Sequence, residues 1–255
     1  ALVAAVLDHE ITACDLGNHY LNGTLIDQNY SKAIKWFKIA AKKFDSNAQF
    51  QLGCMYHNGL GVKQDYEEAF KWMKESADQG LDMAQGSLGF MYEKGQYVTK
   101  DEEEAFKLYK MAAKQGFYAC QYSLGRMYSE GIGVDKDIDK AIKWLKKSAA
   151  QDDVSSQAVL GCIYEDMDDY KKAYKWHMKA AEKDHIISQN SLGIMYAQGK
   201  GVATNHREAF KWFKKSADQG NTDAQENLEM ANEYKKMTEW LEQDQDDQPE
   251  APVLH

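Results

Sequence analysis

One apolar pattern recurs along the chain at a nearly constant spacing. In the copy that spans 48–80 it places Ala48, Leu52 and Tyr56 four residues apart, which predicts one buried stripe of an α-helix. A Leu-Gly dipeptide marks each copy, and its leucines are 36 residues apart except for a final step of 32. They are Leu16, Leu52, Leu88, Leu124, Leu160 and Leu192. A fixed period of roughly 20–50 residues is typical of stacked repeats.

Each copy also contains a second helix, which follows a glycine-rich loop. In the copy at Leu52, Gly59 ends the first helix, and Asp65 with Glu68 predicts a capping box at the start of the second. Gly80 is expected to end that second helix. The equivalent helix starts in other copies are Asp101, Asp137 and Asn205, with Glu104 and Glu208 completing two further boxes. Because one such pair cannot bury its own apolar face, we expect the copies to stack.

The glycine of the Leu-Gly dipeptide needs its own explanation. Gly53 lies inside a predicted helix, where glycine costs about 1 kcal/mol relative to alanine. Its recurrence indicates that the second helix of the same copy packs where a Cβ would collide.

The whole pattern reads Ala-x-x-x-Leu-Gly-x-x-Tyr-x-x-Gly-x-Gly-Val and then Ala-x-x-Trp-x-x-x-Ala. It resembles the Sel-one-like repeat family, relatives of the tetratricopeptide repeat, over residues 11–230. The resemblance implies an all-α fold, an α–α superhelix built as a right-handed solenoid of helix–loop–helix repeats. Two departures are Leu108, which stands where other copies have Trp, and the copy near Ser155, which lacks the Gly-x-Gly-Val loop.

The pattern also predicts how the chain is divided. We expect a partial helix or cap at 1–10, as part of a helix that leads up to Gly17, and six repeats over 11–221. A polar helix over 222–243 would then cap the stack, since a terminal repeat needs one wetted face. Residues 244–255 are predicted to form an acidic flexible tail.

Charge argues against nucleic acid as a partner. The formal charge is −9 and the pI is about 5.3, whereas binding to a phosphate backbone needs clustered Lys and Arg. From Thr238 onward there are six acidic residues and no basic one, so self-association through this tail is one hypothesis. No apolar run approaches the roughly 20 residues of a membrane span.

The four cysteines favour a reducing compartment such as the cytoplasm. Cys54 and Cys162 occupy the same place in copies that are three repeats apart, too far to bridge in a stack. We therefore expect free thiols, with a Cys14–Cys54 bridge as the one alternative left open. A removed export signal also stays open, because the chain begins with Ala1.

The search for an active site, a cofactor or a metal centre is largely negative. No Gly-x-x-x-x-Gly-Lys-Ser/Thr and no His-Glu-x-x-His occurs. His177 and His185 are eight residues apart and are interpreted as surface residues. Acidic pairs such as Asp168-Asp169 lie at predicted helix starts, where the helix dipole favours carboxylates. We expect neither a cofactor nor a bound metal.

Two series on the second helices are interpreted as structural. Tryptophan at helical spacing in almost every copy favours inter-helix core over an aromatic ligand cage. The series is Trp36, Trp72, Trp144, Trp176 and Trp212. A lysine precedes each Trp position, and we expect a solvated face whose methylene groups cover the rings. These are Lys35, Lys71, Lys107, Lys143, Lys175 and Lys211.

The variable side of the first helices is the better candidate for a site. By resemblance to tetratricopeptide arrays, this side lines the concave surface where peptides bind. Phe50, Phe90 and Tyr122 would place aromatic side chains on consecutive repeats, which suits a binding surface. The alternative is that some of these residues pack between repeats or are plain surface. The candidate partner-binding residues are Asn18, Phe50, Cys54, His57, Asn58, Phe90, Glu93, Lys94, Tyr122, Arg126, Glu130 and Asn190.

The resemblance therefore predicts a non-enzymatic scaffold or adaptor that binds a protein or an extended peptide in a groove. A β-lactam-binding or hydrolysing enzyme is one alternative, drawn from a cysteine-rich branch of the family. This chain lacks that branch's disulfide in each repeat and has no Ser-x-x-Lys. A bacterial effector that engages host proteins is the other alternative.

Overall fold

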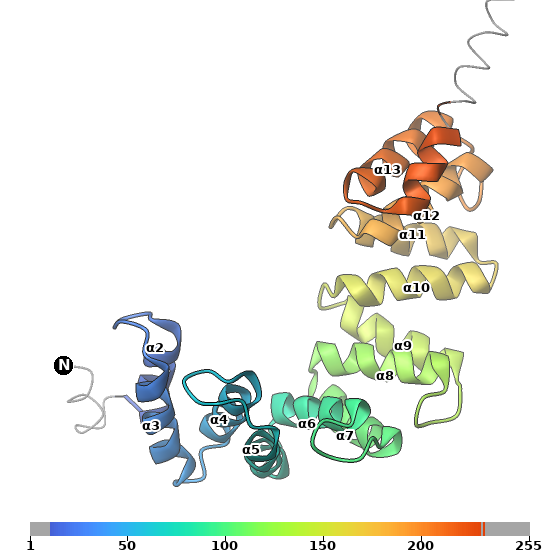
Figure 1. Ribbon diagram of the computed structural model, residues 1–255. Helices are drawn as coiled ribbons and strands as arrows, with labels where there is room; N and C mark the ends of the chain where they lie inside the picture. The colour runs from blue at the N-terminus through green and yellow to red at the C-terminus, as the bar shows by residue number, and fades with distance from the viewer. Residues whose placement is uncertain (1–10, 231, 233–255) are drawn as a thin grey trace, which may run out of the picture. The chain divides into compact units, whose positions relative to one another are not determined.

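The computed structural model describes residues 11–230 and residue 232 (Figure 1). Its regular elements are all α-helices, and no strand occurs between residues 11 and 230. They are α2 (Ala13–Asn22), α3 (Tyr30–Ala41), α4 (Ser46–Asn58), α5 (Tyr66–Asp78), α6 (Asp82–Lys94), α7 (Glu102–Gln115), α8 (Tyr118–Glu130), α9 (Ile138–Ala149), α10 (Val154–Asp166), α11 (Tyr170–Ala181), α12 (Ile186–Gln198) and α13 (His206–Asp218). Residues 222–230 are also helical. The predicted all-α class is confirmed.

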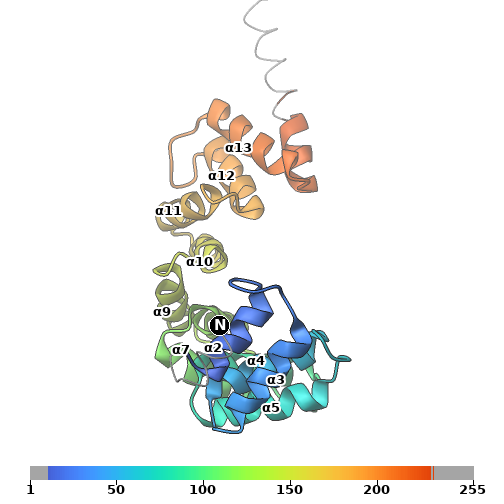
Figure 2. The same cartoon turned by 90° about the vertical axis from the view of Figure 1, so that its left-hand side faces the viewer.

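The chain forms two compact units, Ala1–Gln151 and Asp152–His255. In the first unit, α2 pairs with α3, α4 with α5, α6 with α7 and α8 with α9, and each pair packs on the next. In the second unit, α10 pairs with α11 and α12 with α13, and α11 packs on α12. The pairs follow one another in chain order within each unit (Figure 1 and Figure 2). Contacts in series between helix pairs are those of a helical-repeat solenoid.

The glycine of each Leu-Gly dipeptide lies against the second helix of its own repeat. A Cβ added to Gly53 would lie 2.6 Å from Met73 Cγ, and one added to Gly125 would lie 2.5 Å from Leu145 Cγ. Real Cβ atoms essentially never come this close to another heavy atom, so any side chain here would push the two helices apart. The predicted reason for the recurring glycine is confirmed.

The second glycine of the Gly-x-Gly loop has a different function. A Cβ on Gly133 would lie 2.2 Å from the carbonyl oxygen of Glu102, and one on Gly201 would lie 2.1 Å from that of Tyr170. Both carbonyls are at the start of the second helix in the preceding repeat. Both glycines also have positive φ, 63° and 72°. The loop therefore fixes the contact between repeats and is more than a turn.

The N-cap residues are as predicted, but the capping boxes are not. Asp65 Oδ1 accepts from the backbone N–H groups of Glu67 and Glu68. Asp101, Asp137 and Asn205 also cap their helices. The Glu68 carboxylate, instead of reaching back to the cap, lies 3.1 Å from Lys71 Nζ. Glu104 and Glu208 pair in the same way with Lys107 and Lys211. A lysine three residues onward competes for the carboxylate that the box would use.

A complete capping box occurs where the sequence did not indicate one. Thr12 and Asp15 cap each other's backbone at the start of α2. The helix therefore begins at Ala13, so the predicted helix leading up to Gly17 does not extend through Ile11 and Thr12.

Buried glutamines join successive repeats, a feature that the sequence analysis missed. Gln121 donates from Nε2 to the carbonyl oxygen of Ala113 (3.2 Å) and accepts from Gln151 Nε2 (3.0 Å). Gln189 repeats this arrangement with Ala181 and Gln219 in the second unit. The side-chain amide thus satisfies a carbonyl near the end of the preceding helix, which would otherwise be buried without a partner.

The five tryptophans of the series on the second helices are half-buried, and the residue that follows each of them is buried. Trp72 packs against the core that contains Phe37, Ala48 and Leu52. A lysine lies over three of the indole rings. It is not the predicted lysine that precedes the Trp but the one three residues after it, on the same face of the helix. The distances from Nζ to the ring centroid are 4.2 Å for Lys147 on Trp144, 4.6 Å for Lys179 on Trp176 and 4.7 Å for Lys215 on Trp212.

The prediction that His177 lies on the surface is wrong. Its side chain is 0% exposed, because it follows Trp176 and occupies the position that faces the Leu-Gly dipeptide of its repeat. Its ring atom Cε1 would lie 2.4 Å from a Cβ on Gly161. Phe37, Leu145 and Phe213 fill the same position in other repeats. Periodicity therefore places the imidazole in the core.

The four cysteines are free thiols, so the Cys14–Cys54 bridge is not formed. Burial raises the pKa of Cys14 and Cys120 to about 12 and that of Cys54 to about 11. None of the described helices is long and apolar enough to cross a bilayer. Residues 222–230 are helical, while 1–10, most of 231–243 and the tail lie outside the described residues, so the predicted terminal caps and tail stay predictions.

Candidate protein-binding groove

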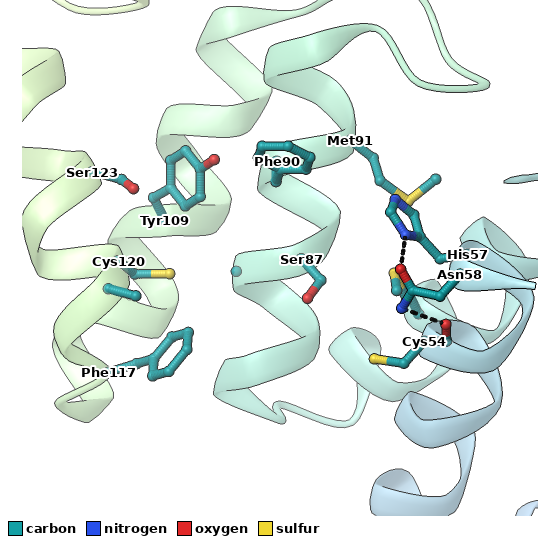
Figure 3. Close-up of a pocket in the computed structure, with 13 residues that line it drawn as sticks. Cys54, His57, Asn58, Ser87, Phe90, Met91, Tyr109, Phe117, Cys120 and Ser123 are labelled. Carbon is teal, nitrogen blue, oxygen red and sulfur yellow. Dashed lines mark hydrogen bonds between the residues drawn. The ribbon is translucent and has the colours of Figure 1, made fainter. Parts of the chain in front are cut away.

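A pocket of about 410 Å³ lies in the first unit, between first helices of successive repeats (Figure 3). Four of the predicted partner-binding residues line it: Cys54, His57 and Asn58 from α4, and Phe90 from α6. Side chains that the sequence analysis did not select complete the lining, among them Ser87, Phe117, Cys120 and Ser123. The structure thus places part of the predicted surface around one depression.

Gly86 explains why α8 and the residue before it come so close to α6. A Cβ on Gly86 would lie 2.7 Å from Cys120 Sγ and 3.1 Å from Phe117 Cε1. Phe117 is the N-cap residue of α8, and its side chain makes no capping hydrogen bond. Its ring instead lines the pocket beside Cys120 (Figure 3). The missing side chain at position 86 therefore decides which residues form this wall.

The side of the pocket formed by α4 is polar. His57 Nδ1 lies 3.3 Å from Asn58 Oδ1, and Asn58 Nδ2 donates to the carbonyl oxygen of Cys54 at 2.9 Å (Figure 3). His57 Nε2 also lies 3.1 Å from Oε1 of Gln96, in the loop of the next repeat. These hydrogen bonds fix the imidazole and the amide at the edge of the pocket.

Phe90 gives the pocket exposed apolar surface. Its side chain is 41% exposed, although it belongs to a helix whose next residue, Met91, is buried. Lys94 Nζ lies 5.8 Å from the centroid of the Phe90 ring. An exposed aromatic ring beside a depression and next to polar groups is the arrangement found at binding hot spots.

An ionic cluster adjoins the pocket. Glu93 accepts hydrogen bonds from Tyr109 Oη (2.9 Å), Arg126 Nη2 (2.9 Å) and Lys94 Nζ (3.0 Å). Arg126 Nη1 also lies 3.2 Å from Glu130. Burial raises the pKa of Glu93, but the hydrogen bonds from Lys94 and Tyr109 and the charge of Arg126 outweigh it. The pKa of Glu93 is therefore below its usual value.

Four predicted residues lie elsewhere. Phe50 is half-buried and packs against a core that includes Ala77 and Leu88, so it joins repeats, the alternative left open above. Asn18 is on α2, and Tyr122 is half-buried on α8 outside the pocket lining. Asn190 belongs to the second unit, is nearly buried, and accepts from Asn227 Nδ2 at 3.1 Å.

The chemistry of the pocket suits binding. Its thiols, Cys54 and Cys120, have raised pKa values and are therefore protonated at neutral pH, which makes them poor nucleophiles. Phe90 and Phe117 offer apolar surface, and His57 and Asn58 offer hydrogen-bonding groups at the rim. Such a lining can hold an apolar side chain together with a short stretch of polypeptide backbone.

The helix pairs stacked in series define a helical-repeat protein. The Sel1 repeat matches the chain six times, at 12–43, 46–81, 82–117, 119–153, 155–185 and 186–221. The chain belongs to the Sel1 repeat family. Members of this family are generally helical scaffolds for protein–protein interaction.

Two solved structures are similar over most of the chain. One is c5321, a protective antigen of uropathogenic Escherichia coli strains, with 36% sequence identity and a TM-score of 0.82. That match covers 85% of this chain but 47% of the antigen, so the chain spans about half of the antigen's length. The other is a Sel1 repeat protein from Oxalobacter formigenes, with 32% identity, a TM-score of 0.72 and coverage of 81% and 86%.

A more distant likeness extends to the immunity protein Pa5087 of Pseudomonas aeruginosa. Its identity is 14%, its TM-score is 0.50 and its coverage is 81% of each chain, so it shows the fold alone. No protein of curated function matches the chain.

Proposed function

We propose that this chain is a non-enzymatic scaffold that binds a peptide or protein segment in the groove formed by α4, α6 and α8. The single observation that supports it is Phe90, whose ring is 41% exposed beside a pocket of about 410 Å³. A lone exposed apolar residue is ordinary on a protein surface. An exposed ring that continues into an apolar depression with a polar rim is what a partner's anchor residue fills.

The segment that fits carries one apolar or aromatic side chain as its anchor. That side chain would occupy the space between Phe90, Phe117 and Ser87, and His57 and Asn58 would bond to polar groups of the segment. Contacts between repeats hold the groove in place before binding, such as His57 with Gln96 and Arg126 with Glu93. A pre-formed groove lowers the entropy that association costs.

Neither alternative drawn from the family resemblance gains support from the described residues. The raised thiol pKa values in the pocket disfavour covalent catalysis by cysteine. An effector function concerns which partner is bound, and the groove proposal applies to that case as well.

The proposal is tested by selecting peptides from a displayed random library on the full chain. Their affinities are then compared on Phe90→Ser and on Met111→Ser. Met111 is the matched control, because it is 49% exposed but lies on α7 outside the pocket lining. We expect Phe90→Ser to weaken peptide binding about tenfold or more, equivalent to about 1.4 kcal/mol. Met111→Ser should bind the same peptides with unchanged affinity. Recovery of no peptide, or equal affinities for both variants, would refute the proposal.

A further inference from the structure

A thiol, a carboxylate and an imidazole meet in the second unit, whereas the groove belongs to the first unit. Cys162 and Glu165 lie three residues apart on α10, and His177 faces them from α11. One potential ligand atom of each lies within 4.8 Å of the other two. We propose that these three side chains bind one divalent cation of the zinc class. This inference goes beyond the scaffold function and does not depend on it.

His177 is the best evidence for a built site. Its side chain is 0% exposed, yet its Nε2 atom has no hydrogen-bond partner among the described residues. Nε2 lies 3.5 Å from Glu165 Oε2. The other ring nitrogen, Nδ1, lies 3.1 Å from Ser188 Oγ. A histidine with one nitrogen held by a hydrogen bond and the other free resembles a metal ligand with its outer-shell partner.

The fold directs the free nitrogen toward the other two ligands. The ring packs on the backbone of α10 because Gly161 has no side chain to displace it. Cys162 follows that glycine directly, and Glu165 is on the same face of the helix, three residues onward. One imidazole nitrogen, one thiolate and one carboxylate are ligand types that zinc uses, and three protein ligands leave a position for solvent.

The ligand atoms need only a small movement to close on an ion. Zinc–ligand distances of about 2.0–2.3 Å place two ligands of a tetrahedral ion about 3.3–3.8 Å apart. Cys162 is exposed, and the Glu165 side chain is 31% exposed. Both can therefore rotate toward the ion while the buried His177 stays in place.

In the repeat that contains Leu88, Glu93 and Tyr109 stand at the positions of Glu165 and His177. There Glu93 accepts a hydrogen bond of 2.9 Å from Tyr109, a purely structural contact between the paired helices. Phe90 stands at the position of Cys162 in that repeat. The thiol of Cys162 therefore distinguishes this cluster from the structural pair of Glu93 and Tyr109.

A cobalt titration of the full chain tests the proposal, because Co²⁺ substitutes for zinc and reports its ligands by absorption. We expect one equivalent of Co²⁺ to produce the thiolate charge-transfer band and intense visible bands of four-coordinate cobalt, and Zn²⁺ to displace it. Cys162→Ser should abolish the charge-transfer band, and Glu165→Gln should weaken Co²⁺ binding at least tenfold. The matched control is Cys54→Ser, which removes a thiol at the same repeat position, where Met73 replaces His177.

The outcomes that would overturn the proposal are equally definite. Absence of a charge-transfer band in the wild-type chain would do so, as would a band that Cys162→Ser retains or that Cys54→Ser removes. His177→Gln should also lose Co²⁺ binding. If circular dichroism shows that this buried substitution unfolds the second unit, Cys162→Ser and Glu165→Gln decide the matter, because both side chains are at least partly exposed.

Discussion

Arg126 on α8 reaches Glu93 on α6, and its Nη2 atom lies 2.9 Å from Glu93 Oε1. The contact joins the first helices of two neighbouring repeats at the edge of the groove. The Glu93 side chain is 11% exposed and also accepts from Tyr109, so the ion pair is largely shielded from solvent. Shielded charges with several hydrogen bonds are costly to separate, so this pair holds the two helices in register.

The first prediction concerns the pH dependence of stability. The folded pKa of Glu93 is below its ordinary value of 4.5, so the unfolded chain binds the proton more readily. The stabilisation is therefore present above about pH 4.5 and is lost as the pH falls through the lower folded pKa. We expect Glu93→Gln to lower the free energy of unfolding by about 1–3 kcal/mol at pH 7. Urea denaturation should show that difference shrinking at more acidic pH.

Glu130→Gln is the control for this experiment. Glu130 pairs with the same arginine but is 51% exposed. Exposed ion pairs contribute about 0–1 kcal/mol, so this variant should change the free energy of unfolding little, both at pH 7 and at more acidic pH. A pH-independent effect of Glu93→Gln would contradict the assigned pKa direction.

The second prediction concerns the close contact between Gly125 and Leu145. Gly125→Ala adds a Cβ 2.5 Å from Leu145 Cγ, and the overpacking should outweigh the gain in helix propensity by about 1–2 kcal/mol. Leu145→Ala alone should cost about 2–5 kcal/mol. Because the smaller side chain makes room for the new Cβ, the double variant should lose less stability than the sum. Strict additivity would show that the two residues do not press on each other.

The third prediction separates the ring of Trp72 from its polar atom. The indole Nε1 is buried and has no hydrogen-bond partner among the described residues, while the ring packs on the neighbouring core. Trp72→Ala should therefore lower the free energy of unfolding by about 3 kcal/mol. Trp72→Phe should cost clearly less, since no hydrogen bond is lost. Equal losses in thermal denaturation would indicate that the indole N–H makes a contact after all.

The fourth prediction distinguishes the two phenylalanines that the sequence grouped together. Phe50 packs between repeats against Ala77 and Leu88, whereas the Phe90 side chain is 41% exposed to solvent. Phe50→Ala should lower the melting temperature, and Phe90→Ala should leave it nearly unchanged. A melting temperature that falls as much in Phe90→Ala as in Phe50→Ala would assign both residues to the core.

The repeating elements could be predicted because each is set by a local signal. Leu52-Gly53 marks a close helix contact, and Asp65 marks a helix start, and the structure shows both. The predicted capping boxes do not form, because a lysine such as Lys71 competes with the backbone for the carboxylate. The buried glutamines also have a sequence signal, since glutamine stands three residues before the Leu-Gly leucine in every copy except the first, which has Ala13 there.

The lining of the groove depends on contacts between helices of neighbouring repeats, which periodicity alone does not specify. Which residues line the pocket depends on Gly86, whose missing side chain admits Phe117 and Cys120 from the next repeat. His177 has a polar side chain at a repeat position whose residues are buried. Its polarity favours the surface, whereas its position in the repeat correctly predicts the core. The reducing compartment, self-association through the acidic tail and the absence of a nucleic-acid partner stay predictions.

The most direct test of the groove is to map where a bound peptide lies. A peptide selected on the full chain would carry a photoreactive group next to its apolar anchor, and mass spectrometry would locate the cross-link after irradiation. The account predicts adducts on α4, α6 and α8 near Phe90, Cys54 and Ser123, which line the pocket. Adducts confined to the second helices, for example around Met111 on α7, would contradict it.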